Sequence, residues 1–125
     1  MWHSCGRFTL KELFAKCDPA VLRLFRRFEK MVRACGPVTM VPQKTRVVFM
    51  VRVRHVAVYP HKNYLLCSLA LPKRQRSLRF SKIEKYTSRF IGHYTRIDSE
   101  DQLDAQLQRW LHESYAVGKQ DSPPS

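Results

Sequence analysis

Acidic residues are nearly missing from the middle of this 125-residue chain. Residues 37–97 hold thirteen Lys and Arg but a single acid, Glu84, although the whole chain carries ten acids and a net charge of +13. Without a second carboxylate, this region cannot supply the acid pair of glycosidic or aspartyl chemistry. A field of this sign attracts polyanions, so nucleic acid is the first partner to consider.

Catalytic and cofactor motifs are also missing. The four glycines are single, so no Gly-rich loop can hold a nucleotide's phosphates, and no G-x-S-x-G is present. The four cysteines form no C-x-x-C, and three of them (Cys17, Cys35 and Cys67) fall on apolar stretches, which predicts buried free thiols. The sequence therefore predicts no catalytic residue, no metal and no cofactor, and we expect a non-enzymatic role.

Long apolar runs are missing as well. No stretch approaches the roughly 18 apolar residues of a spanning helix, and residues 1–7 lack the apolar core of a secretory signal. We therefore expect a cytoplasmic protein without a membrane partner. The chain length suits one domain, which we place at residues 9–118, between an N-terminal segment at 1–8 and a disordered tail at 119–125.

Local signals predict two helices in the N-terminal part. Thr9 and Glu12 form a capping box at the start of a short helix over residues 10–16. Asp18-Pro19 is typical of a second helix start, after which apolar residues recur at helical spacing until Gly36-Pro37. The other face of this second helix is basic.

From residue 38 onward the hydrophobic pattern changes to a period of two, which is typical of strands. Runs at 38–41, 45–59, 64–71 and 90–97 predict about four to five antiparallel strands, because 45–59 is long enough to form a hairpin that turns near residues 52–54. Residues 78–89 show no clear period.

A second capping box, at Ser99–Gln102, predicts a last helix that Gly118 closes. The fold class is therefore α+β: N-terminal helices, an antiparallel β-sheet, and a C-terminal helix packed on one face of that sheet.

Seven short segments share their order and spacing with a known family. They are Trp2–Gly6, Thr9–Phe14, Gly36–Val38, Pro42–Arg46, Val58–Pro60, Gly92–Ile97 and Trp110–Tyr115. Over about residues 2–118 the chain resembles the bacterial domain-of-unknown-function family numbered 5655. The resemblance implies no activity, because none is established for the family. Some members are labelled predicted transport proteins, and related domains occur fused to restriction-type nuclease modules, which implies a cytosolic role near nucleic acid.

The same resemblance bears on the N-terminus. Some members begin with a zinc-ribbon-like segment, a Cys-x-x-Cys followed by a His-x-Cys. His3-Ser4-Cys5 resembles the second half, and the Cys-x-x-Cys half is absent from this chain. Since a structural zinc site needs four ligands, residues 1–8 are expected to be a remnant that holds no metal.

The first function hypothesis is a basic module that contacts the phosphates of nucleic acid or another polyanion, with salt-sensitive and weakly sequence-specific binding. Tyr86 and Phe90 lie among basic residues, as base-stacking aromatic residues do in single-strand binders. The residues expected to contact phosphates are Arg26, Lys30, Arg52, Arg54, Arg74, Arg76 and Lys82.

Two further hypotheses stay open. One is a ligand-binding or regulatory domain with an anion pocket, since a Lys beside a His and a Tyr could bind an anion. The pocket residues would be Lys44, Tyr59, His93 and Tyr94. The other is a protein-interaction module, monomeric or homodimeric, in which the acidic last helix pairs with a basic surface. Its acidic residues would be Asp101, Asp104 and Glu113.

Overall fold

The helices begin where the sequence carries capping residues. In the computed structural model, which describes residues 8–85 and 90–119, α1 (Leu10–Leu13) starts with the expected capping box. The Thr9 hydroxyl accepts from the Glu12 N–H (3.1 Å), and the Glu12 carboxylate accepts from the Thr9 N–H (3.0 Å). α2 (Pro19–Ala34) follows Asp18 and ends before Gly36, whose φ of 145° suits glycine. Both predicted helices are confirmed, although α1 is shorter than residues 10–16.

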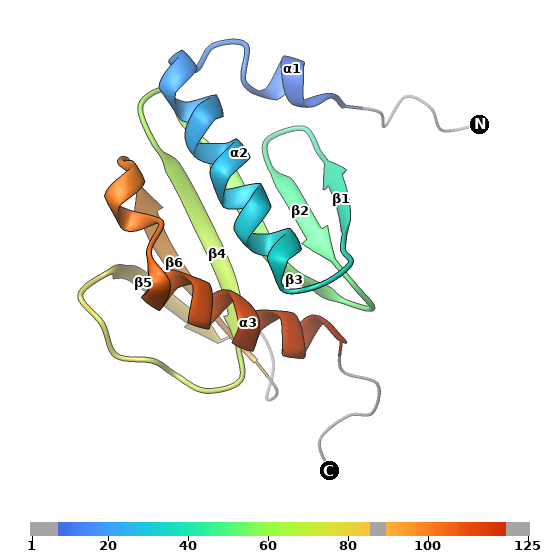
Figure 1. Cartoon of the computed structure of the whole chain (residues 1–125), viewed down its shortest axis with the longest axis vertical. Coiled ribbons are helices and arrows are strands. Elements are labelled where there is room, and N and C mark those ends of the chain that lie inside the picture. The colour runs from blue at the N-terminus through green and yellow to red at the C-terminus, as the bar shows by residue number, and fades with distance from the viewer. Residues whose placement is uncertain (1–7, 86–89, 120–125) are drawn as a thin grey trace.

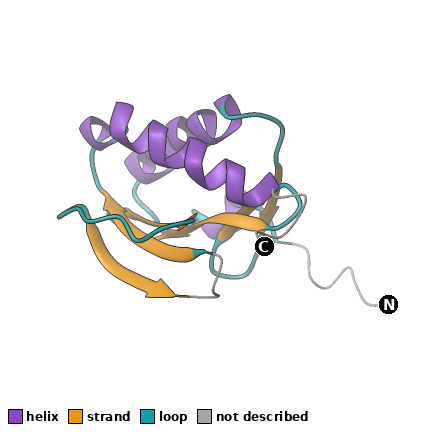
Figure 2. Ribbon diagram, turned by 90° about the horizontal axis from the view of Figure 1, so that it is seen from below, coloured by secondary structure: helices purple, strands orange, loops and turns teal. Residues whose placement is uncertain are grey.

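Six antiparallel strands form one sheet, and the helices lie together on one of its faces (Figures 1 and 2). The order across the sheet is β1-β2-β3-β4-β6-β5, so β6 lies between β4 and β5. The predicted α+β class is confirmed, with a sixth strand beyond the expected four to five. The strands are β1 (Thr39–Pro42), β2 (Val47–Met50), β3 (Arg54–Pro60), β4 (Leu65–Leu71), β5 (Phe80–Lys85) and β6 (Ile91–Ile97).

Two features of the sheet were weakly marked in the sequence. β5 falls in the stretch without a clear period, because it is an edge strand whose side chains are exposed or half-buried on both faces. β2 and β3 form the expected hairpin, with a register shift between Phe49 and Met50. Such a bulge bends and twists the strand, which helps the chain to reverse without glycine or proline.

The last helix begins later than the second capping box suggested. That capping box starts only the short 3-10 helix η2 (Glu100–Gln102). The helix does not continue, because Arg79 donates to the Gln102 carbonyl (2.6 Å), which a continuous helix would use for its own backbone hydrogen bonds. α3 (Ala105–Lys119) starts anew at Asp104, whose carboxylate accepts from the Leu107 N–H (3.0 Å). Gly118 lies inside α3 and does not close it, which corrects the sequence-based expectation.

The core lies between the sheet and the helices. It is built from alternate residues of β2, β3 and β4 and from the apolar faces of α2 and α3, and burying each such side chain stabilises the fold by about 1.5–3 kcal/mol. Cys67 is fully buried as predicted. Cys17 and Cys35 are only half-buried at the core margin, because each follows the end of a helix. The largest fully buried side chains include Phe25, Phe28, Phe49, Leu65, Leu69, Leu107 and Leu111.

Some of the sequence-based predictions fall on residues outside the described part of the chain. These are the His3–Cys5 remnant, Tyr86, and residues 120–125 of the expected tail, whose first residue, Lys119, is instead the last residue of α3. Within residues 8–85 and 90–119, no helix is both long enough and apolar enough to cross a bilayer.

Candidate functional site

One face of the sheet is turned away from all the described helices (Figure 2), and we call it the open face. Successive side chains of a strand point to opposite faces, so the neighbours of core residues point to the open face. Since Val47, Val58, Cys67 and Leu69 are core residues, the positions between them supply the open face. From β2, β3, β4 and β6 it carries Val48, Ala57, Tyr59, Leu66, Ser68, Ala70, Tyr94 and Arg96.

A hollow of about 740 Å³, the first hollow, occupies the centre of this face. Its floor is low because small side chains (Ala57, Ser68 and Ala70) follow one another on β3 and β4. The larger side chains of Met50, Tyr59, Phe90 and Tyr94 surround the floor. Three arginines, Arg46, Arg52 and Arg54, line it as well, and its described lining contains no acid. An aromatic depression with this charge suits a ligand that is both planar and anionic.

A smaller second hollow, of about 330 Å³, adjoins the first. Tyr59 and Tyr94 line both hollows, so the two tyrosines form a divide between them. The second hollow is also lined by His61, Leu66 and Lys82, and its described lining again contains no acid. Because Leu66 precedes Ser68 on β4 and His61 follows Tyr59 at the end of β3, the hollows succeed each other along these strands.

The cations around the two hollows are Arg46, Arg52, Arg54, Lys82 and Arg96, which we call the open-face cations. Arg46 is the most firmly placed: its Nε donates to the Gln43 side chain (2.8 Å), and its guanidinium donates to the Tyr59 hydroxyl (3.1 Å). Lys82 lies 5.5 Å from the Tyr94 ring centre and 3.7 Å from the Glu84 carboxylate.

Arg96 lies farther along the strands, 4.0 Å from the ring centre of Tyr64, and pairs with Asp98 (3.1 Å). Exposed ion pairs of this kind contribute about 0–1 kcal/mol, so an incoming phosphate can replace the carboxylate at little cost.

The position of Arg52 and Arg54 depends on α3. The backbone N–H groups of Arg52 and Val53 both donate to the Gly118 carbonyl (2.9 and 3.1 Å), and the Ser114 hydroxyl donates to the His55 carbonyl (2.8 Å). This approach needs glycine, because a Cβ on Gly118 would lie 2.5 Å from His55 Nδ1. The end of the helix thus holds the β2–β3 turn, and with it one rim of the first hollow.

His55 joins this turn to the core. Its ring is buried against Gly118 and Tyr115 of α3, and the residue is also part of the lining of the first hollow. Burial lowers the pKa of His55 to about 4, against a smaller opposing effect of the Val53 backbone. At neutral pH the imidazole is therefore uncharged and adds nothing to the positive rim.

The four residues predicted for an anion pocket are not brought together. Tyr59 and Tyr94 meet at the divide, whereas Lys44 is exposed in the β1–β2 turn and His93 is fully buried on the helix side. Neighbours in one strand point to opposite faces, so His93 and Tyr94 cannot share a pocket. The cation beside Tyr59 is Arg46. Because Arg46 precedes the core residue Val47, strand alternation could have indicated that Arg46 points to the open face.

The contacts of His93 hold the fold together, because both of its ring nitrogens are hydrogen-bonded to backbone groups. The backbone N–H of Gln75 donates to its Nε2 (2.9 Å), so the proton lies on Nδ1, which donates to the Ile91 carbonyl (2.9 Å). The ring stands edge-on to Phe80, with the ring centres 4.8 Å apart. Burial lowers the pKa of His93, and nearby Arg74 adds to this effect.

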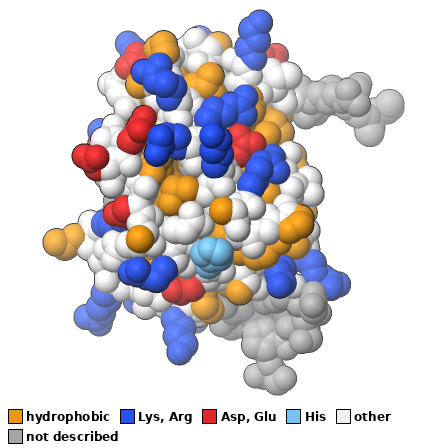
Figure 3. Space-filling view, in the orientation of Figure 1, with side chains coloured by type: hydrophobic (Ala, Val, Ile, Leu, Met, Phe, Trp, Pro, Cys, Tyr) orange, Lys and Arg blue, Asp and Glu red, His pale blue; other side chains and the backbone are white. Residues whose placement is uncertain are grey.

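The seven predicted phosphate contacts divide among three places. Arg52, Arg54 and Lys82 lie at the two hollows. Arg74 and Arg76 lie in the exposed loop between β4 and β5, and Arg26 and Lys30 lie on α2. Figure 3 shows cationic side chains over α2 with acidic ones among them.

The acids near α2 are partly engaged with its cations. Glu29 pairs with Arg26 (2.9 Å) and Arg33 (3.0 Å), and Arg27 pairs with Glu100 (3.4 Å). Two acids therefore pair with three of the five cations of α2. Sequence reasoning missed Arg46 and Arg96 as members of the open-face cations.

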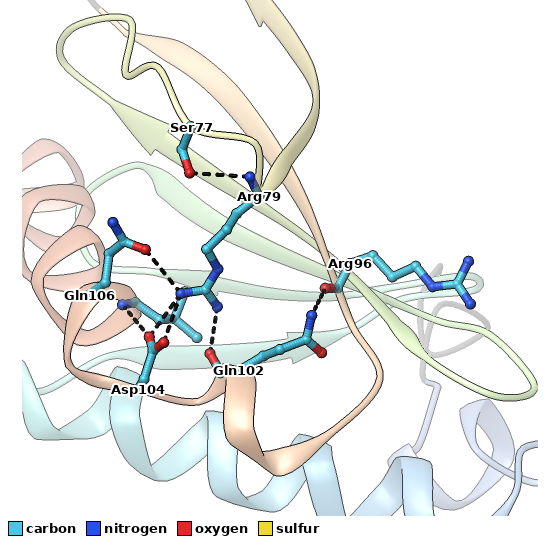
Figure 4. Close-up of polar contacts among 7 residues, drawn as sticks. Ser77, Arg79, Arg96, Gln102, Asp104 and Gln106 are labelled. Atoms are coloured by element: carbon cyan, nitrogen blue, oxygen red, sulfur yellow. Dashed lines mark hydrogen bonds and ion pairs between the residues drawn. The ribbon is translucent and has the colours of Figure 1, made fainter.

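Arg79 ties β5 to the start of α3 (Figure 4). Its guanidinium donates to both Asp104 carboxylate oxygens (2.8 and 3.1 Å), to the Gln106 side chain (3.2 Å) and to the Gln102 carbonyl (2.6 Å). It also lies 5.6 Å from the ring centre of Trp110. Burial alone would raise the pKa of Asp104, but the Arg79 and Leu107 hydrogen bonds lower it more. Asp104 therefore stabilises the fold. It is not available for the acidic interaction surface predicted from Asp101, Asp104 and Glu113.

These observations define a small two-layer α+β domain whose uncovered sheet face carries an aromatic, arginine-rimmed depression. The chain belongs to the family described as Domain of unknown function (DUF5655), whose model matches residues 10–118 and so confirms the resemblance seen in the sequence. No curated protein and no solved structure matches the chain.

Proposed function

We propose that this domain is a non-enzymatic module that binds nucleic acid on the open face of its sheet. The observation that carries the proposal is the first hollow, in which aromatic side chains and three arginines meet without an acid in the described lining. The arginines would contact phosphates, and the aromatic side chains would contact bases.

The combination of arginines with accessible aromatic side chains favours this face over the helix side. Among the described residues, Glu84 pairs with Lys82 and Asp98 with Arg96, and exposed pairs of this kind are weak. On the helix side, Arg26 and Arg33 share Glu29, and Arg79 is fully engaged with α3. Phosphate contacts without a base-reading motif lead to dissociation constants on the order of 10⁻⁴ to 10⁻⁶ M at physiological salt.

The test is fluorescence anisotropy with labelled single- and double-stranded DNA at salt concentrations of about 50 and 200 mM. The doubly substituted variant Arg54→Gln/Lys82→Gln removes one Arg and one Lys from the open face. The matched control, Arg26→Gln/Lys30→Gln, removes the same charge from α2. We expect the first variant to weaken binding roughly tenfold and the control to change it less than about twofold.

Two results would contradict the proposal. If neither DNA binds at the lower salt concentration, the domain is not a nucleic-acid module. If the α2 variant loses binding and the open-face variant keeps it, the binding surface is on the helix side.

A second candidate is an anionic small molecule in the first hollow, whose volume of about 740 Å³ is in the range of ligand pockets. Arg46 and Tyr59 would hold it, in place of the Lys44 and His93 expected from sequence. A thermal-shift screen with nucleotides and other aromatic anions tests this candidate. The expected stabilisation would be lost in Arg46→Gln and kept in Lys44→Gln, a neighbouring cation outside the hollow.

A further inference from the structure

The open face offers two adjoining hollows along β3 and β4, with the Tyr59–Tyr94 divide between them. Building on the nucleic-acid function proposed above, we propose that the ligand is a single strand. It runs along β3 and β4 through both hollows and places at least one base on each side of the divide.

The arrangement of the divide supports this path. In the register of the sheet, Tyr59 lies opposite Leu66 and Tyr94 lies opposite Ser68, so the two tyrosines stand on strands that flank β4. Their strands are roughly 10 Å apart, and the two positions are offset by two residues along β4, so the two backbones are roughly 12 Å apart. A base in the first hollow and a base in the second would each have both tyrosines as neighbours, which is how successive bases use aromatic platforms.

The two tyrosines are also held in place. The Tyr59 hydroxyl accepts from Arg46 (3.1 Å), and the Tyr94 hydroxyl donates to Glu84 (3.4 Å). Preorganised rings lose little freedom when a base stacks on them, so more of the stacking free energy appears as affinity.

Charge favours a polymer over a single small anion. The cations stand at both ends of the path: Arg52 and Arg54 at the first hollow, and Lys82 at the second. Arg96 continues the path beyond Leu66, its partner in the sheet register. A monophosphate could reach only one of these groups, whereas a chain of phosphates can reach both.

A duplex fits the hollows less well. Its bases are paired and stacked, and only their edges are accessible from the grooves, so none can enter a depression in a sheet. A single strand exposes whole bases and can follow the aromatic side chains. The structure thus favours unpaired nucleic acid at this site.

The experiment compares labelled oligo(dT) of about two, four and eight nucleotides with thymidine monophosphate and with a DNA duplex of about the same length as the longest strand. We expect affinity to increase at least roughly tenfold from the mononucleotide to the longer strands, and the duplex to bind more weakly.

Ring substitutions test the divide itself. Tyr59→Leu and Tyr94→Leu are each expected to weaken single-strand binding roughly tenfold while leaving its salt dependence unchanged, because stacking contributes no charge. Tyr94→Phe keeps the ring and loses the hydroxyl with its long hydrogen bond to Glu84 (3.4 Å), so it should bind far more tightly than Tyr94→Leu and close to the native protein. Phe8→Leu is the control for loss of an aromatic ring elsewhere, since Phe8 is an exposed aromatic residue ahead of α1 that lines neither hollow.

The outcomes separate the two proposals. If no oligonucleotide of any length binds, both are refuted. If the duplex binds as well as the single strand, or if the leucine variants bind like the native protein, the nucleic-acid function stands and the two-hollow path is wrong. Equal affinity for the mononucleotide and the longest strand would also refute the path. Should a leucine variant fail to fold, the length series and the comparison with the duplex still decide.

Discussion

Substitution of Gly118 by alanine tests how the open face is built. In the interior of a helix, alanine is normally more stable than glycine by about 1 kcal/mol. Here the added Cβ would lie 2.5 Å from His55 Nδ1 and 2.8 Å from His55 Cγ. Since real Cβ atoms do not approach so closely, either the His55 ring or the helix end must move.

Neither group can move without loss. The His55 side chain is buried, and its carbonyl accepts from Ser114 (2.8 Å). The Gly118 carbonyl accepts two backbone N–H groups of the β2–β3 turn. Overpacking in such a place costs about 1–3 kcal/mol and loss of a buried hydrogen bond a similar amount. Overpacking alone, after the helix-propensity gain of about 1 kcal/mol is subtracted, gives a net loss of about 0–2 kcal/mol, or up to roughly 8 °C in Tm, and a lost hydrogen bond would add to this loss.

The assay is urea and thermal unfolding of Gly118→Ala, His55→Ala and the double variant. Because the two closest contacts are with the His55 ring, and only the 3.1 Å contact with its Cβ remains in His55→Ala, Gly118→Ala should lose most of its cost in that background. Ala116→Gly, at an exposed position of the same helix, measures helix propensity alone. A rise in Tm for Gly118→Ala in the native background would refute the reasoning about this contact.

The same variant should report on function. The strained helix end would displace the turn that carries Arg52 and Arg54, so we expect weaker binding to single-stranded DNA at a temperature where the variant is still folded. Unchanged binding would mean that the turn is not part of the binding face.

Three more predictions follow from contacts in the structure. The pKa of His55 is about 4 in the folded protein and about 6.5 in the unfolded chain, so the unfolded chain binds the proton first as the pH falls. The contribution of neutral His55 to stability is therefore complete above pH 6.5. It falls by about 3 kcal/mol as the pH is lowered to 4. Urea unfolding at both ends of this range should show the loss, His55→Gln should reduce it, and a pH-independent stability would contradict it. Arg79→Met should lower the free energy of unfolding by about 1–3 kcal/mol in urea, because the Gln102 carbonyl loses its donor. Arg23→Met, at an exposed position of α2, should change it little, and equal effects of the two substitutions would contradict the structural role of Arg79. Binding to single-stranded DNA should weaken with salt at a logarithmic slope of up to about 3.5, since each of five open-face phosphate contacts contributes about 0.7; a flat response would exclude phosphate contacts.

Local sequence patterns anticipated most of the secondary structure. Thr9 and Glu12 cap α1, Asp18-Pro19 opens α2, and the period of two marks the strands around the β2–β3 hairpin. These signals work because each depends on residues within one helical turn or on alternation along one strand. The errors lie where a distant group intervenes. Arg79 donates to the Gln102 carbonyl, which a longer helix would have used for its own hydrogen bonds. The β2–β3 turn donates to the Gly118 carbonyl, and α3 continues past Gly118, where the sequence predicted its end.

The candidate site was anticipated only in part. Tyr59, Tyr94, Arg52, Arg54 and Lys82 were chosen from the sequence, and they do lie around the two hollows. The sequence-based prediction placed His93 and Tyr94 in one pocket, but adjacent residues of a strand point to opposite faces, so His93 faces the helices.

The amino-acid sequence by itself determined the basic middle of the chain, the fold class and the limits of most elements, because these follow from composition and from nearest neighbours. Only the tertiary structure decided which cations gather. The insertion of β6 between β4 and β5 places Tyr94 beside Ser68, two strands from Tyr59. Strand order depends on packing between residues far apart in the chain, for which no local pattern carries a signal, and that packing left one face of the sheet open.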